Sequence, residues 1–416
     1  MSEIAQAPHS SPDGKIPQLR FPEFNDNWEE QKVGSFMVER NKKSPKSEAF
    51  PLMSFVARKG VTEKGKRYNR EFLVNDEGGK KYKQTEYGDF IYSSNNLETG
   101  SIGLNKYGAA TISPVYSIFQ ITDTCNYEFV SSSLVTKIFI HKMVRFRQGV
   151  VYGQWRIHES DFLKIQVELP SLEEQTKIAS FLSSIDSKIE QLSKKQALLG
   201  EYKKGLMQQI FSQAIRFKAD DGSDFPDWEE KKLGDVCKLQ GGYAFKSAEF
   251  QKHGIPIIRI SNISNNNDFI DNRNLVYYNE IKNSDKFIIK NGDLIVAMSG
   301  ATTGKSSIYN LIEDAYLNQR VGLFKANNSL LDYGFLIQIV FSYIFATQLD
   351  SVLVAGAQPN VSSKDIEGFE ISLPSKIEQN KIANFLSSID SKIEQVGKQL
   401  DESKQFKKAL LQQMFV

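Results

Sequence analysis

The chain has 416 residues, with 52 basic against 50 acidic side chains, so its formal net charge is only +2. Hydrophobic residues make up 40% of the chain and charged residues 25%, which excludes a wholly disordered or collagen-like protein. The longest apolar stretch, 335–346, has 12 residues, whereas a membrane span needs about 20, so we expect a core segment there. Residues 1–16 show no secretory signal pattern and few large apolar side chains, and we expect a disordered tail.

Residues that commonly bind metals or act as nucleophiles are scarce. The chain has four histidines, none of them at metal-ligand spacing, and no Gly-x-Ser-x-Gly or Gly-x-Gly-x-x-Gly motif. We therefore expect no metal site and no catalytic residue on this chain. The two cysteines, Cys125 and Cys237, cannot build a disulfide framework, which is typical of the reducing cytoplasm, where we expect this protein to reside.

An internal repeat organises the whole chain. Segments 169–191 and 373–395, which are 204 residues apart, are identical at 19 of 23 positions. Gly88-Asp89 recurs as Gly292-Asp293 at the same offset, and Trp28 recurs as Trp228 at an offset of 200. The chain is therefore one unit of about 200 residues written twice.

The first element in chain order, 17–168, is predicted to be a mixed α/β domain, because short apolar runs such as 90–92 are broken by Gly, Asn and Ser. Segment 58–83 has a net charge of +5, and a second basic cluster lies at 145–156. Basic side chains neutralise phosphates, and Arg and Gln reach base edges, so both clusters are candidates for DNA binding; a solvated surface is the alternative. The candidate residues are Arg58, Lys59, Arg145, Arg147, Gln154 and Arg156.

A long helix follows in each copy, 169–213 in the first and 373–416 in the second. Ser171 with Glu174, and Ser375 with Glu378, match the Ser-x-x-Glu capping box that begins a helix. Apolar residues then alternate at spacings of four and three, as in a coiled-coil seam. The seam residues are Ile178, Leu182, Ile185, Ile189 and Leu192, repeated as Ile382, Leu386, Ile389, Ile393 and Val396.

Two near-identical seams in one chain favour pairing with each other. A pseudo-twofold relationship between the copies would make the two helices antiparallel, whereas the alternative is that each helix belongs to its own bundle core. The predicted fold class is therefore α+β: two tandem mixed α/β domains, each followed by a long helix, with the helices paired as an antiparallel coiled coil. About 40 residues of helix correspond to roughly 60 Å.

The second globular part, 214–372, is also predicted to be mixed α/β, with strands at 255–258 and 294–296. Its formal charge is −4 against +4 for 17–168, so neither part is a uniformly basic DNA-binding surface. The candidate contacts are mostly polar and lie in several predicted loops. They are Tyr243, Phe245, Lys246, Arg259, Asn262, Thr302, Thr303, Lys305, Arg320 and Gln358.

Two stretches of the second part are similar to enzyme motifs but differ in spacing. Segment 300–306 resembles a phosphate-binding loop, yet three residues separate its glycines where that motif needs four. We expect instead a turn that offers Lys305 to a nucleic-acid backbone; a turn buried against helices is the alternative. Asp227 and Glu230 resemble a nuclease signature, but only two residues separate them, too few for a return strand. We expect a structural role, with Trp28 and Trp228 as anchors.

The chain resembles the specificity subunits of type I DNA restriction-modification systems over 17–415. The resemblance rests on the two LPSxxEQxKIAxFLSSIDSKIEQ helices and on 254–263, 298–305 and 317–322. It implies that each globular part is a target recognition domain for one half of a split DNA site, and that the helices set the spacer. It further implies two methyltransferase subunits around the helices, restriction and translocase subunits in the full complex, and S-adenosylmethionine and ATP on those partners.

The two globular parts differ where they would read DNA. Asn95-Asn96 stands where the second copy has Ser299-Gly300, and Ser101 stands where it has Lys305. Near-identical helices with divergent domains fit an asymmetric target. Two other classes remain open: an enzyme complete in one chain, although no Asn-Pro-Pro-Tyr or Asp-Pro-Pro-Tyr methyltransferase motif is present, and a coiled-coil scaffold without a role in nucleic-acid binding.

Overall fold

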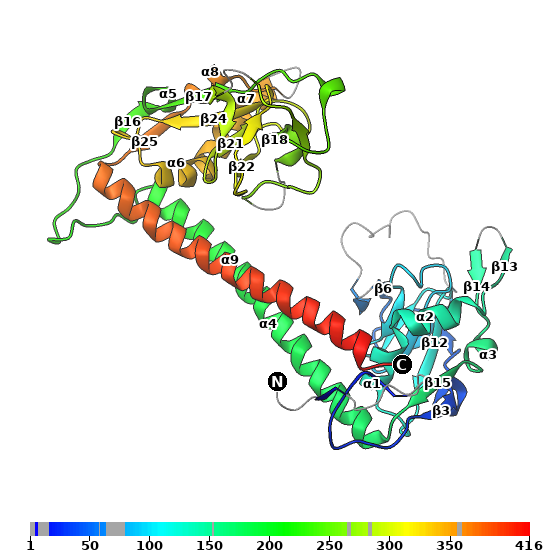
Figure 1. Ribbon diagram of the computed structural model, residues 1–416. Helices are drawn as coiled ribbons and strands as arrows, with labels where there is room; N and C mark the ends of the chain where they lie inside the picture. The colour runs from blue at the N-terminus through cyan, green and yellow to red at the C-terminus, as the bar shows by residue number, and fades with distance from the viewer. Residues whose placement is uncertain are drawn as a thin grey trace. The chain divides into compact units, whose positions relative to one another are not determined.

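The computed structural model describes residues 5–6, 16–57, 59–63, 80–151, 154–263, 268–281, 285–355 and 360–416 (Figure 1). The chain divides into two compact units. The first unit is Met1–Ser193 with Lys398–Val416, and the second unit is Lys194–Gly397. Both dividing lines fall inside a long helix, so each unit holds one globular part and a piece of each helix.

A four-stranded antiparallel sheet forms the centre of the first globular part, in the order β10-β9-β12-β4. Its strands are β4 (Met37–Glu39), β9 (Phe90–Tyr92), β10 (Ile102–Leu104) and β12 (Ser117–Ile121). A three-stranded sheet has the order β11-β8-β5, from β5 (Lys43–Ser44), β8 (Tyr82–Thr85) and β11 (Ala110–Ile112). The remaining pairs are β1 (Ala5–Gln6) with β2 (Leu19–Arg20), β3 (Glu29–Lys32) with β15 (Gln166–Leu169), β6 (Ser54–Val56) with β7 (Gly60–Thr62), and β13 (Gln148–Val151) with β14 (Gln154–Arg156).

The second globular part repeats the central sheet, in the order β22-β21-β24-β17. These strands are β17 (Cys237–Gly241), β21 (Leu294–Ala297), β22 (Ser306–Ile308) and β24 (Val321–Ala326). A second sheet has the order β19-β18-β23-β20, from β18 (Ile255–Ile258), β19 (Val276–Tyr278), β20 (Ile288–Ile289) and β23 (Ala315–Leu317). β16 (Glu229–Lys232) pairs with β25 (Glu370–Leu373), as β3 pairs with β15 in the first unit.

Short helices occupy matching places along both copies. The first globular part has α1 (Tyr127–Leu134), α2 (Lys137–Val144) and α3 (Glu159–Phe162), which match α6 (Tyr333–Val340), α7 (Tyr343–Ala355) and α8 (Ser363–Glu367) of the second. The second also has α5 (Leu233–Val236), where the first has the 3-10 helix Val33–Ser35. The predicted strands at 90–92, 255–258 and 294–296 are confirmed as β9, β18 and part of β21. All residues of β9 and β21 are buried, because both faces of these central strands are covered.

The long helices are α4 (Leu172–Phe211) and α9 (Lys376–Gln413). In the first unit, Ile178 and Leu182 near the start of α4 share a core with Leu410 near the end of α9. In the second unit, Ile382 near the start of α9 shares a core with Ile210 near the end of α4. The start of one helix therefore packs beside the end of the other in each unit, and the predicted antiparallel pairing is confirmed.

Two ion pairs show the register of the helices. Lys407 of α9 contacts Asp186 of α4 in the first unit, and Lys203 of α4 lies 2.6 Å from Asp390 of α9 in the second. From Asp186 to Lys203, α4 advances by 17 residues, and the partners of these two residues, Lys407 and Asp390, are 17 residues apart in the reverse direction along α9. Of the predicted seam residues, Ile189, Leu192 and Ile393 are half-buried, and the others are buried: Ile178, Leu182, Ile185, Ile382, Leu386, Ile389 and Val396.

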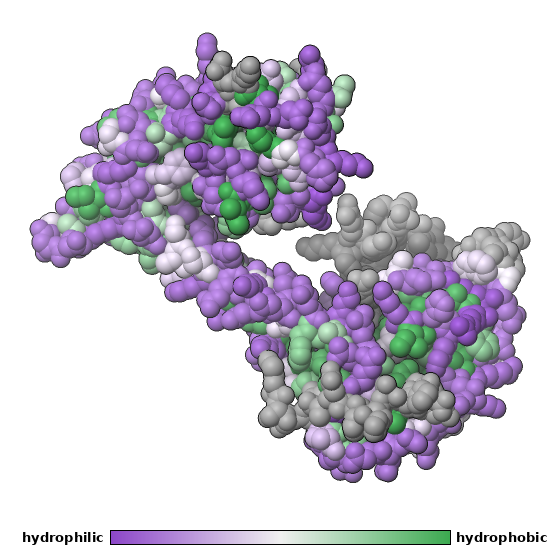
Figure 2. Space-filling view, viewed as in Figure 1, coloured by the Kyte–Doolittle hydropathy of each residue, from purple (hydrophilic) through white to green (hydrophobic). Residues whose placement is uncertain are grey.

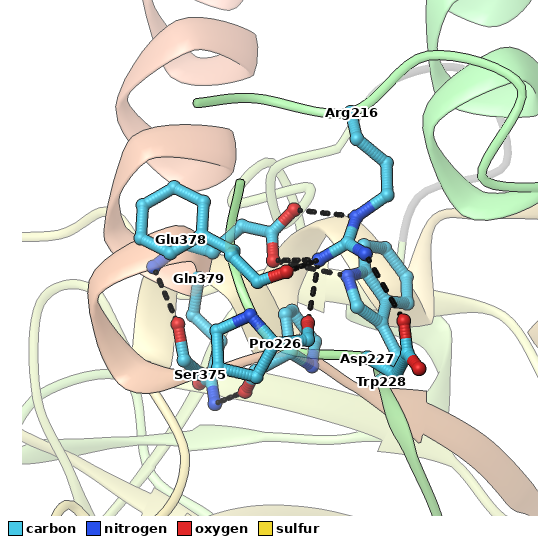
Figure 3. Close-up of polar contacts among 9 residues, drawn as sticks. Arg216, Pro226, Asp227, Trp228, Ser375, Glu378 and Gln379 are labelled. Carbon is cyan, nitrogen blue, oxygen red and sulfur yellow. Dashed lines mark hydrogen bonds and ion pairs between the residues drawn. The ribbon is translucent and has the colours of Figure 1, made fainter. Parts of the chain in front are cut away.

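Of the two hydrogen bonds that define a capping box, only the one to the serine hydroxyl forms at each predicted site. The Ser171 and Ser375 hydroxyls accept the backbone N–H of Glu174 and Glu378, as the motif requires. The glutamate side chains, however, turn away from the serine N–H groups. Glu378 instead accepts hydrogen bonds from Arg216 and from the Trp228 indole, as Figure 3 shows. The motif predicts the helix start but not the carboxylate's partner.

Most of the surface visible in Figure 2 is hydrophilic. Within the described part of the chain, no single helix is long and apolar enough to cross a membrane. Only α6 and Tyr343–Val354 meet that test, as a pair bent by 54°. Phe335 and Leu336 of this pair lie in the second unit's core, as predicted for 335–346. Of the predicted tail, Ala5–Gln6 form β1, and the other residues up to 15 lie outside the described ranges.

Candidate nucleic-acid interface

Four loops meet at one end of the central sheet in the second globular part. The turn 298–305 connects β21 to β22, and the Met298 N–H donates to Arg320 O at 2.9 Å. The Thr302 hydroxyl donates to Ile260 O at 2.9 Å, which brings in the short 3-10 helix Ile260–Asn262. The Tyr243 N–H donates to Leu317 O at 2.8 Å, which adds the loop after β17. We call this set, 242–246, 259–262, 298–305 and 318–320, the loop cluster.

Most of the candidate residues of the second part lie in the loop cluster. Tyr243, Lys246, Lys305 and Arg320 are exposed, and Lys246 also lies 3.4 Å from the Glu249 carboxylate. Phe245 is half-buried, with its ring centroid 5.0 Å from that of Tyr243 and equally far from that of Tyr278. The cluster therefore offers cationic and aromatic groups together. Gln358 lies outside the described residues.

Asn262 corrects the prediction. It is 1% exposed, its side-chain oxygen accepts the Arg259 N–H at 3.1 Å, and its amide donates to Asp271 O at 3.0 Å. Because both ends of the amide are used inside the domain, Asn262 does not fit the role of a base contact. Arg259 is half-buried, donates to Asn274 O at 3.2 Å and lies over the Phe250 ring, so its side chain supports a loop.

The threonine hydroxyls of the turn also bond inside the domain. Thr302 donates to Ile260 O and Thr303 donates to Gly300 O at 2.6 Å. A hydroxyl keeps acceptor capacity after donating, but neither threonine is exposed. The predicted contact of Thr302 or Thr303 with a groove stays a prediction, and it would use only the acceptor capacity that remains to each hydroxyl. Lys305 is the candidate of this turn whose side chain is exposed.

The turn 298–305 is a hairpin connection and not a phosphate-binding loop. It joins two antiparallel strands, whereas the nucleotide motif leads from a strand into a helix. Gly304 has φ +79° and packs against α7, where an added Cβ would come within 2.2 Å of Leu349 Cδ2. The turn is therefore anchored on α7, as the alternative interpretation held, while Lys305 remains exposed.

The equivalent turn of the first part, 93–101 between β9 and β10, meets the hairpin of β13 and β14. The Trp155 N–H donates to Asn95 Oδ1 at 2.6 Å, and the Ile157 N–H donates to Ser94 Oγ at 3.0 Å. In the second part, Val361, which is 204 residues after Ile157, donates its N–H to Met298 O at 2.9 Å. Both parts thus place the same two segments together with different side chains.

The arginines near that hairpin have different environments. Arg145 and Arg156 are exposed, and the Arg156 guanidinium lies 3.8 Å from the Glu159 carboxylate. Arg147 is largely buried and forms a two-point ion pair with Glu98, at 2.6 and 2.7 Å. These hydrogen bonds lower the pKa of the Glu98 carboxyl. Arg147 therefore corrects the prediction, because its guanidinium shapes the turn instead of facing a ligand.

The remaining candidates of the first part are only partly described. Lys59 is exposed, whereas Arg58 and most of the basic segment, 64–79, lie outside the described residues. Gln154 is described as part of β14 without its side chain. Sequence reasoning missed Trp155, which is 45% exposed, has Arg147 over its ring and sits between two candidates. Its position between Gln154 and Arg156, two candidate DNA contacts, was the feature of the sequence that pointed to Trp155.

The motif that resembled a nuclease is structural. Asp227 has an exposed side chain 3.8 Å from Arg216, and Glu230 lies on β16 with its carboxylate 2.5 Å from the Ser372 hydroxyl. Trp28 and Trp228 are buried, as predicted for anchors. Over the described ranges, no group of three or more His, Cys, Asp or Glu side chains could hold a metal ion.

Comparison with known proteins identifies the family. The model of the type I restriction modification DNA specificity domain matches twice, over residues 25–199 and 226–402. The type I restriction enzyme MjaVIII specificity subunit of Methanocaldococcus jannaschii is 27% identical over 411 residues, covering 94% of this chain and 92% of the relative. The EcoAI specificity subunit of Escherichia coli is 27% identical over 179 residues, covering 41% of this chain and 29% of the relative.

Solved structures agree in fold. The S subunit of a type I restriction-modification system from M. genitalium has a TM-score of 0.62 at 16% identity, covering 96% of this chain and 99% of that one. A chain from a study of complex assembly and conformational transition of the type I R-M system gives 0.53 at 16% identity, covering 92% and 96%. The family model covers most of the chain in two tandem matches. This protein therefore belongs to the type I restriction-modification DNA specificity family, whose members recognise DNA sequence and are not themselves the catalytic subunits.

Proposed function

We propose that each globular part reads one half of a split, asymmetric DNA site, and that α4 and α9 set the number of base pairs between the halves. One observation carries this proposal. Both parts have the same strand order in the central sheet. In both, the turn after the second strand of that order, 93–101 or 298–305, contacts the segment around Ile157 or Val361, yet the side chains at this contact differ. A shared backbone arrangement that carries different side chains suits the recognition of two different half-sites.

A domain exchange tests the split reading. Residues 17–168 would be replaced by those of another family member, and methylated adenines would be mapped in cells that also express the partner subunits. We expect one half-site to change while the other half-site and the spacer stay the same. Replacing 214–372 is the matched control and should change the other half-site. A change in both half-sites from one exchange would contradict the proposal.

We further propose that two methyltransferase subunits dock on the long helices, and that restriction and translocase subunits join them. S-adenosylmethionine and ATP would bind to those partners. Tyr202 and Phe406 support this, because they stand 204 residues apart at equivalent helix positions and are both exposed. Changing both to Ser should weaken the assembly in size-exclusion chromatography, whereas the exposed Leu198, which has Glu402 at its equivalent position, offers a control outside the symmetric pair.

Two competing classes make different predictions. If the chain were a complete methyltransferase, the purified chain with S-adenosylmethionine alone would methylate DNA, and we expect no such activity. If it were a scaffold only, the assembled complex would show no sequence preference on DNA. We also infer a cytoplasmic location, since Cys125 and Cys237 are both free thiols buried in the two domains, which suits a reducing compartment.

A further inference from the structure

Each globular part is joined to the helix that follows it through a buried carboxylate. In the first unit, Arg20 donates twice to Glu174, at 2.7 Å each, and the Trp28 indole donates to the same carboxylate at 3.4 Å. Glu174 is 1% exposed. A carboxylate that accepts a two-point guanidinium and an indole is held in one orientation, because the planar groups fix its direction as well as its distance.

The second unit repeats this arrangement (Figure 3). Arg216 donates to Glu378 at 3.2 and 2.8 Å, and the Trp228 indole donates to it at 3.1 Å. Glu378 is fully buried. Arg216 additionally donates to Pro226 O at 2.7 Å, which ties the connector between α4 and β16 to the start of α9.

The next residue of each helix makes a second connection. In the first unit, the Gln175 amide donates to Pro170 O, and its oxygen accepts the N–H of Asn126, the N-cap of α1. In the second unit, Gln379 donates to Pro374 O and accepts the N–H of Asp332, the N-cap of α6, at 2.7 Å. We call these contacts of the Glu-Gln pair with the Arg, the Trp and the N-cap the joint.

The joint persists although the connectors differ. Arg20 and Arg216 are 196 residues apart, and the tryptophans are 200 apart, so the second connector is four residues longer between them. The extra residues are accommodated without loss of either hydrogen-bond donor. Phe21 and Phe217, which follow the arginines, also pack edge-on against equivalent rings of the helices, Phe181 and Phe385. The same attachment is thus made twice by two different loops.

A buried ion pair is a poor source of stability, because desolvation offsets much of its Coulomb energy. What it contributes reliably is geometry: hydrogen bonds are lost when they stretch by about 1 Å, whereas neighbouring base pairs along DNA are about 3.4 Å apart. The joint therefore restricts how far a globular part can tilt on its helix end.

We propose that Glu174 and Glu378, acting through Arg20 with Trp28 and Arg216 with Trp228, are positioning residues that make the protein selective for one spacer length. This rests on the proposed split reading of DNA. The joint does not contact bases, so it affects the distance between half-sites and leaves their sequences unchanged. Loosening one joint should let that globular part accept DNA with a spacer one base pair shorter or longer.

The test uses the assembled complex with wild-type chain and with the double variant Arg216→Met, Glu378→Gln. The variant removes both charges together, because a single change would leave a buried charge unpaired. Binding is measured on duplexes that carry the methylation-mapped half-sites with the native spacer or with one base pair more or fewer. Asp220→Asn is the matched control, since Asp220 pairs with Lys381 between the same connector and helix but is exposed.

We expect the preference for the native spacer to fall by about tenfold in the double variant, with equal base preferences in each half-site and no change in the control. A folded variant that keeps the full spacer preference overturns the proposal, as does a change in the half-site sequences. If the double variant unfolds, Trp228→Phe, which removes one donor, should show a smaller loss in the same direction, and an unchanged preference again overturns it. Wild-type complex that prefers no split site would instead reject the proposed function.

Discussion

The ammonium group of Lys203 lies 2.6 Å from the carboxylate of Asp390. Each residue has a counterpart 204 positions away, and those counterparts, Lys407 and Asp186, form the same ion pair with the helices exchanged. One sequence, written twice, thereby supplies both the donor and the acceptor of each pair. The pairs fix the helix register in each unit without requiring any residue outside the repeat.

Lys203→Met should lower the free energy of unfolding by about 1 kcal/mol, because the Asp390 side chain is 35% exposed and stays hydrated when the buried Lys203 ammonium is removed. Asp390 keeps a hydrogen bond from Gln338 at 3.2 Å. A double-mutant cycle with Asp390→Asn, followed by urea unfolding, measures the coupling. Strictly additive effects would show that the pair contributes nothing.

Four residues inserted after Gln191 lengthen α4 by about 6 Å, or nearly two base-pair steps. Because α9 is antiparallel to α4, the same insertion after Gln395 is needed to keep both ion pairs in register. We expect the double insertion to lengthen the recognised spacer with unchanged half-sites, and the single insertion to do so less well. Methylation mapping reads out both; altered half-sites at the old spacer would refute the role of the helices in spacing.

Lys305→Ala should weaken DNA binding about equally on all sequences and reduce the salt slope by about one unit, as expected for a lost phosphate contact. Lys305 is exposed on the loop cluster. Lys325→Ala is the control, because Lys325 is exposed near the end of β24 that lies away from the loop cluster, opposite Lys238 in the β17–β24 register. Salt titrations of the assembled complex compare the two. An unchanged slope for Lys305→Ala would place this lysine away from DNA.

The Glu98–Arg147 pair should make the stability of the first globular part depend on pH in the acidic range. Hydrogen bonds from Arg147 lower the pKa of Glu98 below its usual 4.5, so its contribution is present above that pH and is lost as pH falls through the folded pKa. Glu98→Gln should therefore lower the melting temperature near pH 7 and have progressively less effect below about pH 4.5. The effect is small, since Glu98 is 54% exposed. A difference that grows toward acid pH would reverse the assigned sign.

The repeat and the hydrophobic periodicity predicted the architecture well, because both depend on local order along the chain. The helix seams are an example: alternation by three and four places Leu182 and Leu386 in a core whatever their partners are. Site residues were predicted less well. Asn262 and Arg147 have the right chemistry for DNA, but burial and bonding inside the domain depend on residues distant in sequence, and no local pattern reports them.

The joint shows the same limit. Ser-x-x-Glu predicts a capping box correctly for the backbone, yet the Glu174 side chain finds Arg20, which is 154 residues away. A signal existed in the recurrence of Arg-Phe at 20–21 and 216–217, but the different connector lengths shift its offset to 196 and hide it from a search at 204.

Residues 410–415 complete the core of the first unit. Leu410, Met414 and Phe415 are buried there, and the Phe415 ring lies 5.4 Å from that of Phe129. These residues follow the whole second unit in the chain, so the first domain to be synthesised cannot complete its core until the second unit, which ends at Gly397, has also been synthesised. A truncation just before Leu410 would thus expose the apolar interior of the N-terminal domain and leave the C-terminal one intact.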